Sequence, residues 1–203
     1  MYQAVGSPGS RLTRVTWMLE ELGEPYEIVK AKQYSETMRR FNPTGKMPAL
    51  VDGDIVVTDS AAICAYLGEK HADKGMGPNP GLEGRAEMTS WMLYALSEFE
   101  APMWNKLKHR FILAEDLRCE VGPWVNHEFG AEMKGLEAKL GDRLFALGDR
   151  FTAIDIVLGH CGQWAKSGKF AVTSAKVADY FDRVLSRPAL ARAIAREKEA
   201  TAA

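Results

Sequence analysis

One seven-residue segment, Gly75-Met76-Gly77-Pro78-Asn79-Pro80-Gly81, divides this chain more sharply than any other feature of its sequence. Three glycines and two prolines in seven positions cannot continue a helix or a strand. Strand-like patterns occur only before this segment, and every long segment after it is compatible with a helix. We therefore predict a first domain at residues 1–75, a linker at 76–84 and a second domain at 85–203.

The part of the chain before this boundary alternates strand and helix patterns. Its expected strands are residues 2–5, 25–29, 48–51 and 55–58, and its expected helices are residues 12–22, 33–41 and 61–71. Apolar residues recur at helical spacing from Leu12 to Leu22, and Gly23 is placed to end that helix. The order β-α-β, then α-β-β-α, predicts a small mixed sheet with helices on its faces.

The part of the chain after the boundary has no strand pattern. Its expected helices are residues 83–110, 113–140, 153–166, 174–186 and 188–199. The second domain should therefore be all α, and the fold class expected for the chain is an α+β domain followed by a helical one.

Charge and cysteine content exclude several classes of protein. Lysine and arginine total 26 against 27 acidic residues, so the net charge of -1 provides no overall field for nucleic acid or an anionic membrane. The pattern contains no signal-peptide core or membrane span, and the cytoplasm is the expected compartment. Cys64, Cys119 and Cys161 lack disulfide or zinc spacing, so no metal is expected and each should be a small buried apolar residue.

Pro48 opens the third expected strand, where it cannot donate a ladder hydrogen bond. It must therefore lie at an edge, a bulge or a bend of the sheet. A cis Met47–Pro48 bond would turn the N–H and C=O of Met47 outward, where an extended peptide can pair with them as an added strand. Taken alone, Pro48 also fits the ordinary role of a strand-edge proline.

Asp59 and Ser60 stand where the next helix needs its N-cap. Free backbone N–H groups and the helix dipole favour an anion there, and Ser60 adds a hydroxyl, so this end suits a peptide carboxylate. Asp59 offers the opposite charge to an ammonium group. This corner matches both charges of an amino-acid-like terminus, although a purely structural cap needs the same two residues.

The motifs that carry these features resemble those of the cytosolic glutathione transferases. They are Asn42-Pro43-Thr44-Gly45-Lys46-Met47-Pro48-Ala49-Leu50 and Asp59-Ser60-Ala61-Ala62-Ile63. The opening Ser7-Pro8-Gly9-Ser10-Arg11 is similar to that of many bacterial members, and Phe151-Thr152-Ala153-Ile154-Asp155 resembles the family's capping box. The likeness covers the whole chain, most densely through residue 70. It implies a thioredoxin-like βαβ-α-ββα domain followed by an all-α domain.

The resemblance also implies how glutathione is held. The Met47 backbone would pair with the cysteinyl part beside cis Pro48, and Asp59 and Ser60 would hold the γ-glutamyl end. Candidate cations for the glycine carboxylate are Lys46 and, upstream, Arg39 or Arg40.

Members of this family hold the glutathione thiol as a thiolate with a Tyr, Ser or Cys near the end of the first strand. The loop here has no cysteine, and Tyr2 lies too near the start of the strand, which leaves Ser10 and Ser7. We prefer Ser10, because its hydroxyl, its N–H and the helix dipole would act together. Both serines also fit ordinary capping and turn roles.

By the same resemblance, the first helices of the second domain bind the electrophile. Met103, Trp104 and Phe111 are the candidates, from an aromatic-rich series that is otherwise typical of interhelical core. The expected protein is a homodimeric cytosolic glutathione transferase that conjugates glutathione to hydrophobic electrophiles, or uses it to reduce peroxides. The alternatives are a glutathione-dependent disulfide reductase, a transferase with one dedicated substrate, and a non-catalytic relative that serves in binding or assembly.

Overall fold

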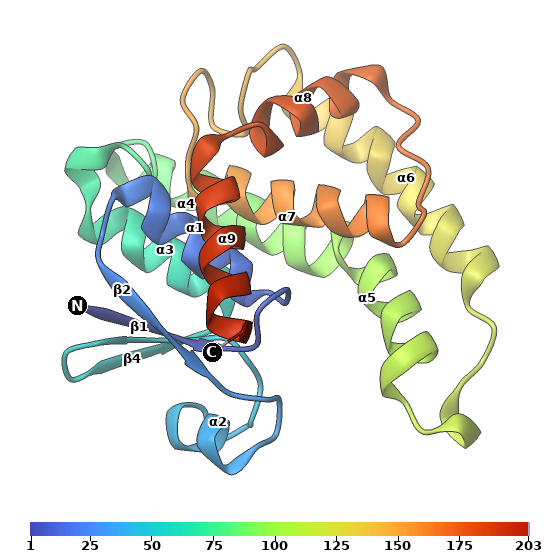
Figure 1. Ribbon diagram of the computed structural model, residues 1–203. Helices are drawn as coiled ribbons and strands as arrows, with labels where there is room; N and C mark the ends of the chain where they lie inside the picture. The colour runs from blue at the N-terminus through green and yellow to red at the C-terminus, as the bar shows by residue number, and fades with distance from the viewer. Residues whose placement is uncertain (203) are drawn as a thin grey trace.

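The computed structural model describes residues 1–202 and has one four-stranded mixed sheet in its first part (Figure 1). The elements of this part are β1 (Tyr2–Gly6), α1 (Leu12–Leu22), β2 (Tyr26–Lys30), α2 (Glu36–Phe41), β3 (Ala49–Asp52), β4 (Ile55–Thr58), α3 (Ser60–Lys70) and the short 3₁₀ turn η1 (Ala72–Lys74). The strand order is β2-β1-β3-β4. β1 runs parallel to β2 and antiparallel to β3, and β3 and β4 form a hairpin.

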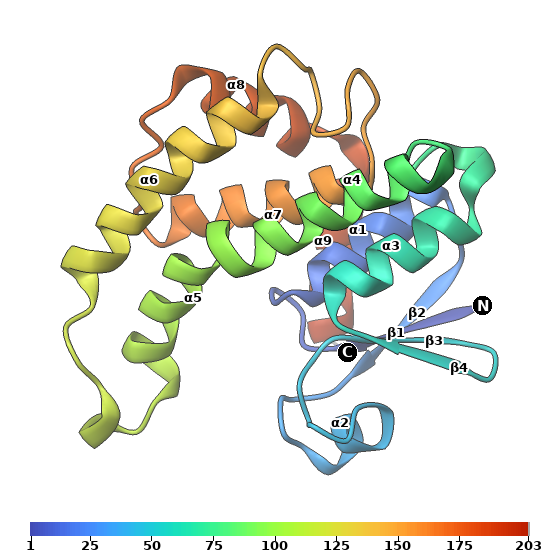
Figure 2. The ribbon, with the colours of Figure 1, turned by 180° about the vertical axis from the view of Figure 1, so that it is seen from behind.

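Helices lie on both faces of this sheet. Figure 2 shows α1 and α3 side by side on one face and α2 on the other. Beneath α2, the buried side chains of Val5, Ala31, Met38 and Ala49 form a small apolar cluster. The βαβ-α-ββα order predicted from the sequence is confirmed.

The rest of the described chain is helical. Its elements are α4 (Gly81–Tyr94), the π-helical turn η2 (Ala95–Phe99), α5 (Ala101–Leu107), the π-helical turn η3 (Lys108–Ile112), the 3₁₀ turn η4 (Glu115–Leu117), α6 (Gly122–Leu140), α7 (Ala153–Ser167), α8 (Ala175–Leu185) and α9 (Pro188–Ala202). The predicted all-α second part is confirmed, and α4 begins inside the segment expected to be the linker. Within residues 1–202 no helix is both long enough and apolar enough to cross a membrane.

α1 is the helix on which the two parts of the chain meet. It contacts α3 of the first part and α7 and α9 of the second, so every residue from Leu12 to Leu19 is buried. The Trp17 ring lies 6.0 Å from that of Phe151. As predicted, Gly23 ends the helix, with φ of 70° and its N–H bonded to Leu19 C=O. One continuous apolar core therefore runs from the sheet into the helical layer.

α7 is the central helix of the second part and begins with the predicted capping box. The Asp155 carboxylate accepts hydrogen bonds from the Thr152 N–H at 2.8 Å and the Thr152 hydroxyl at 3.0 Å. It also accepts from the Ala146 N–H at 2.9 Å and the Tyr180 hydroxyl at 2.8 Å. This buried carboxylate thereby joins the α7 start to the preceding loop and to α8.

The segment predicted as one helix over residues 83–110 is instead broken into α4, η2, α5 and η3. The Glu100 N–H bonds to Ala95 C=O, five residues back, at 2.9 Å. Pro102 has no N–H to continue the regular pattern, and the helix restarts around it.

The helix predicted over residues 113–140 begins only at Gly122, with Pro123 in its first turn, where the missing N–H costs nothing. Cys119 therefore lies in an exposed loop, which corrects the expectation that it is buried, whereas Cys64 and Cys161 are buried as predicted.

Candidate functional site

A cleft of about 1620 Å³ lies between the first part of the chain and the α5–η3 segment. One wall carries the loop after β1, the Met47–Pro48 corner and the start of α3. The opposite wall carries α5, η3 and the end of α7. Of the residues singled out from the sequence, those that line it are Ser10, Lys46, Met47, Pro48, Asp59, Ser60, Met103, Trp104 and Phe111.

The Met47–Pro48 corner exposes backbone hydrogen-bonding groups to this cleft. The peptide bond is cis, as the resemblance implied. Pro48 is buried and Met47 half-buried, and within residues 1–202 neither the N–H nor the C=O of Met47 forms a hydrogen bond. The Asn42 side chain donates to Lys46 C=O at 2.8 Å and fixes the loop just before the corner. Met47 is thus presented as an open edge for another extended backbone.

The start of α3 provides the second polar corner. Asp59 is exposed and accepts from the Ala61 N–H at 3.0 Å, so it caps the helix. Its φ of 71° lies in the left-handed region, which costs about 1–3 kcal/mol for a residue other than glycine. Ser60 is buried, and its Oγ accepts from Arg14 at 3.1 Å. Because Arg14 occupies an acceptor position, the Ser60 hydroxyl proton remains available to a ligand.

The two candidate serines differ in where their hydroxyls point. Ser10 lines the cleft, and its Oγ lies 4.0 Å from the Met47 sulfur. That hydroxyl donates to Ser7 C=O at 2.6 Å and accepts from the Leu12 N–H at 3.2 Å. The Ser7 hydroxyl donates to Ala31 C=O at 3.0 Å, and Ser7 is not among the cleft-lining residues.

Tyr2, which the sequence argument set aside, lies at a different surface. Its hydroxyl is 2.8 Å from His71 Nε2, and the two residues line a separate small depression. Arg39 also stays out of the cleft, because its guanidinium donates to Pro43 C=O at 3.3 Å.

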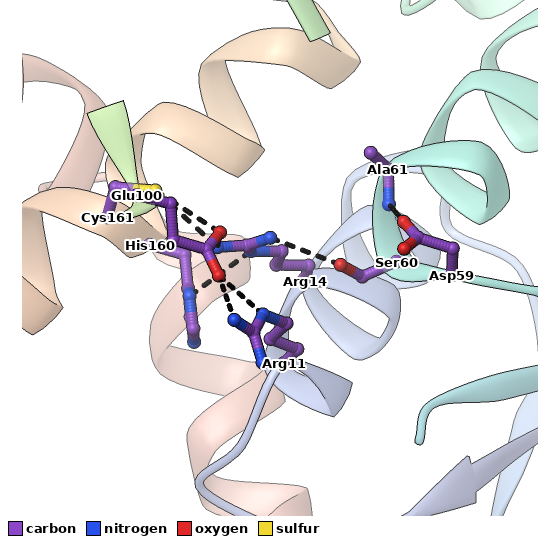
Figure 3. A network of polar contacts seen from close by, with 8 residues as sticks. All are labelled: Arg11, Arg14, Asp59, Ser60, Ala61, Glu100, His160 and Cys161. Atoms are coloured by element: carbon purple, nitrogen blue, oxygen red, sulfur yellow. Dashed lines mark hydrogen bonds and ion pairs between the residues drawn. The ribbon is translucent and has the colours of Figure 1, made fainter. Parts of the chain in front are cut away.

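A buried charged network joins the α3 corner to the helical part (Figure 3). The Arg14 guanidinium donates to Ser60 Oγ, to Glu100 Oε2 at 2.5 Å and to His160 Nδ1 at 3.2 Å. Arg11 donates to the other Glu100 oxygen at 2.5 Å. Burial disfavours the charged form of Glu100, but the two guanidinium groups outweigh it and hold its pKa below the usual range. Burial and the same arginines hold the pKa of His160 well below its usual range, so its neutral ring can accept from Arg14.

Sequence reasoning missed Arg11, Arg14 and Glu100. The sequence signal that could have identified Arg14 and Glu100 as functional candidates is a charged residue among apolar ones. Arg14 lies on the buried face of α1, and Glu100 directly follows buried Phe99. A buried charge needs a partner. The sequence gives no means of identifying that partner, because the two residues are 86 positions apart.

The wall opposite the polar corners is aromatic. Met103 is buried, Trp104 is half-buried, and Phe111 is 66% exposed. The Arg11 guanidinium carbon lies 4.7 Å from the Trp104 ring centre and 4.8 Å from that of Trp164. This wall combines apolar surface with cations, and a planar hydrophobic molecule fits it chemically.

The buried thiols are poor nucleophiles. Burial raises the pKa of Cys64 and of Cys161 to about 12, so both are protonated at neutral pH. Across residues 1–202, no three His, Cys, Asp or Glu side chains lie close enough together to hold a metal ion.

Comparison with known proteins agrees with this architecture. Residues 2–75 match the family described as glutathione S-transferase, N-terminal domain. Glutathione S-transferase Z1 of Arabidopsis thaliana is 33% identical over 141 residues, covering 65% of this chain and 62% of that protein. Glutathione S-transferase theta-3 of Mus musculus is 31% identical over 136 residues, covering 64% of this chain and 56% of that protein. The aligned part is thus less than two thirds of either relative's length.

Solved structures agree over nearly the whole chain. A glutathione S-transferase from Xylella fastidiosa has a TM-score of 0.85 at 20% identity, covering 98% of this chain and 99% of that one. A sphingomonad glutathione S-transferase complexed with glutathione has a TM-score of 0.83 at 24% identity, covering 97% of this chain and 98% of that one. The fold is thus a thioredoxin-like domain joined to a helical domain. The order of the strands in the sheet, the helices of the second part and the cleft between the two parts define it. Residues 2–75 are the part of the chain that the glutathione S-transferase N-terminal family model matches, and the solved structures show the same overall fold.

Proposed function

We propose that this protein is a glutathione transferase that ionises glutathione in the cleft and conjugates it to hydrophobic electrophiles. The observation that carries the proposal is the convergence of Ser10, the unpaired Met47 backbone and Ser60 on one cleft. A backbone edge, a hydroxyl and a helix N-terminus are together what a short acidic peptide with a thiol requires. The naming of its relatives as glutathione S-transferases supports the same activity.

The polar wall accounts for each part of glutathione. The Met47 N–H and C=O pair with the cysteinyl backbone beside Pro48. The Ser60 hydroxyl and the first N–H groups of α3 bind the γ-glutamyl carboxylate, while Asp59 meets its ammonium group. Lys46, exposed on the same wall, meets the glycine carboxylate. Arg39 has the weaker case, because it does not line the cleft.

Ser10 is the group proposed to hold the thiolate. Its proton is now directed at Ser7 C=O, and turning it toward the sulfur exchanges a neutral acceptor for a charged one. The Leu12 N–H already donates to Ser10 Oγ, which strengthens the hydroxyl as a donor. We propose on this basis that the loop is of the serine type, as its resemblance to bacterial members implies.

The same thiolate would also reduce peroxides, and we propose that activity as secondary. We further propose a cytoplasmic homodimer. A disulfide reductase acting through Cys64 or Cys161 is disfavoured, because both thiols are buried with raised pKa values, and the exposed Cys119 does not line the cleft. A transferase with a single dedicated substrate and a non-catalytic binding protein remain the competing functions, and turnover distinguishes them.

The experiment is calorimetric titration with glutathione, followed by conjugation to neutral 1-chloro-2,4-dinitrobenzene. We expect saturable binding below millimolar glutathione and thioether formation. Ser60→Ala should weaken binding by about tenfold or more, since a hydrogen bond to a charged group contributes roughly 1.5–3 kcal/mol. Ser90→Ala, exposed on α4, is the matched control. No binding at millimolar glutathione rejects the proposal, and binding without turnover of any electrophile supports the non-catalytic alternative.

A further inference from the structure

The helical wall of the cleft carries cations that have no carboxylate partner. Lys108 and Arg110 on η3 and Lys169 after α7 all line the cleft. Within residues 1–202 none of the three forms an ion pair, and Arg110 has only the Phe111 ring, 4.9 Å from its guanidinium carbon. The chain as a whole has a net charge of -1, so this excess of positive charge is a property of the helical wall and not of the whole protein.

The acidic residues that line the same cleft do not neutralise them. Glu100 is held by Arg11 and Arg14. Glu197 is buried and accepts hydrogen bonds from the hydroxyls of Thr13 at 3.0 Å and Thr16 at 2.7 Å. Asp59 caps α3 on the opposite wall. The positive charge of the helical wall is therefore uncompensated.

A structural contact links α5, which leads directly into η3, to the turn after α7. The Lys106 ammonium donates to Gly168 C=O at 3.0 Å and lies 4.3 Å from the centre of the Phe170 ring. It thereby ties α5 to the turn that contains Lys169. Trp104 and Phe111 lie on the same wall, so aromatic surface and cations adjoin one another.

Glutathione does not need these cations. On the proposed function, its carboxylates are met by Lys46 and by the start of α3, which lie on the other wall. We propose, resting on that function, that the second substrate is an aromatic electrophile bearing a carboxylate or similar anionic group. Its ring stacks on Trp104 and Phe111, and its anion lies among Lys108, Arg110 and Lys169.

The transfer step itself is ordinary substitution. Glutathione releases its thiol proton to solvent on binding, and the thiolate sulfur forms a bond to the ring carbon that bears a halogen. The carbon–halogen bond then breaks, and the halide leaves with its electron pair. The cations hold the substrate and take no part in these bond changes.

The test compares 4-chloro-3,5-dinitrobenzoate with its neutral methyl ester, each rate divided by the uncatalysed rate with glutathione. We expect the wild-type protein to prefer the acid by about tenfold in kcat/KM, the scale expected of three exposed ion pairs. The triple variant Lys108→Gln, Arg110→Gln, Lys169→Gln should lose that preference through a higher KM for the acid, with the ester unchanged. The matched control, Lys74→Gln, Arg85→Gln, Lys134→Gln, removes three exposed cations outside the cleft and should keep the preference.

A second measurement does not depend on turnover. Unreactive 3,5-dinitrobenzoate should quench tryptophan fluorescence at about tenfold lower concentration than its methyl ester, and only the cleft variant should abolish the difference. Equal preference for acid and ester, or a variant that raises only the KM for glutathione, overturns this inference and leaves the proposed function standing. If neither compound is conjugated while 1-chloro-2,4-dinitrobenzene is, only this inference is overturned; if none of the three is conjugated, both proposals fail.

Discussion

Ser10 has one hydroxyl proton, and in the structure that proton is directed at Ser7 C=O. A free thiol with a pKa near ~8.5 is only a few per cent ionised at neutral pH. A hydrogen bond to a charged acceptor contributes roughly 1.5–3 kcal/mol, and one pKa unit corresponds to ~1.4 kcal/mol. On the proposed function, redirecting this single proton toward the sulfur would lower the thiol pKa by about one to two units and raise its ionised fraction at neutral pH severalfold without a general base.

Ser10→Ala should consequently lower kcat by about ten- to a hundredfold while the Kd for glutathione changes little. Ultraviolet absorbance of the bound thiolate, titrated with pH, should show the thiol pKa returning toward its free value. Ser7→Ala is the matched control and should leave both measurements near wild type. If Ser7→Ala gives the loss instead, the roles of the two serines are reversed.

Glu100 and His160, which both bond to Arg14, contribute to how the stability of the protein responds to acid. The folded-state pKa of each is lowered, so both bind fewer protons when folded than when unfolded. Their stabilisation is therefore complete above the unfolded pKa values, ~6.5 for histidine and ~4.3 for glutamate, and is lost as pH falls. Arg14 and Arg11 are the charged groups that face them both.

We expect the free energy of unfolding, from urea titrations between pH 8 and 3.5, to fall below pH ~6.5 and more steeply below ~4.3. His160→Gln keeps an acceptor for the Arg14 N–H but removes a titrating group. It should flatten the upper part of the profile by up to ~1.4 kcal/mol per pH unit. An unchanged slope between pH 6.5 and 5 would contradict the role given to His160.

At the scale of elements, α9 holds the loop that presents Ser10. The buried Glu197 carboxylate accepts from the Gly9 N–H at 2.8 Å and from the Thr13 and Thr16 hydroxyls of α1. Further along the same two helices, Arg192 and Arg196 pair with Glu20. A helix near the end of the chain thus fixes a loop near its start.

Glu197→Ala leaves three donors without their acceptor and should lower the free energy of unfolding by about 2–4 kcal/mol. It should also reduce kcat more than glutathione affinity, because the loop of Ser10 moves while the Met47 and Ser60 corners do not. Glu199→Ala, exposed on the same helix, is the matched control. Conjugation kinetics at saturating glutathione and urea unfolding measure the two effects, and equal stability of the two variants would contradict the role of Glu197.

At the scale of the whole molecule, the two domains share one core instead of meeting at a wet interface. Gly159 of α7 shows how close the approach is. A Cβ there would lie 2.5 Å from a Val184 methyl and 3.0 Å from the Trp17 ring. α1, α7 and α8 can pack at this distance only because the position lacks a side chain.

Gly159→Ala should therefore destabilise the protein by about 1–3 kcal/mol, in spite of the better helix propensity of alanine. Gly130→Ala in α6, where an added Cβ meets nothing within 4 Å, should be neutral or stabilise by up to ~1 kcal/mol. Thermal and urea unfolding measure both. If Gly159→Ala were instead more stable than Gly130→Ala, the Val184 and Trp17 side chains would have to move aside at little cost.

The sequence by itself determined the features that depend on a few neighbouring residues. Pro48 marked the bend before β3, Asp59 and Ser60 marked the start of α3, and Gly23 marked the end of α1. Each follows from backbone chemistry that operates within a few positions: a missing N–H, a capping side chain, a positive φ. For the same reason the order of strands and helices along the first domain was predictable, whereas the helix breaks near Pro102 and Pro123 were missed within long helical patterns.

Only the tertiary structure decided which distant groups meet. It joined Arg14 to Glu100, 86 positions away, and Gly9 to Glu197, 188 positions away. It also brought Ser10 into the lining of the cleft and placed unpaired cations on the facing wall. Buried charges and open backbone groups require partners, but the choice of partner follows from packing of the whole chain, which local propensity does not encode.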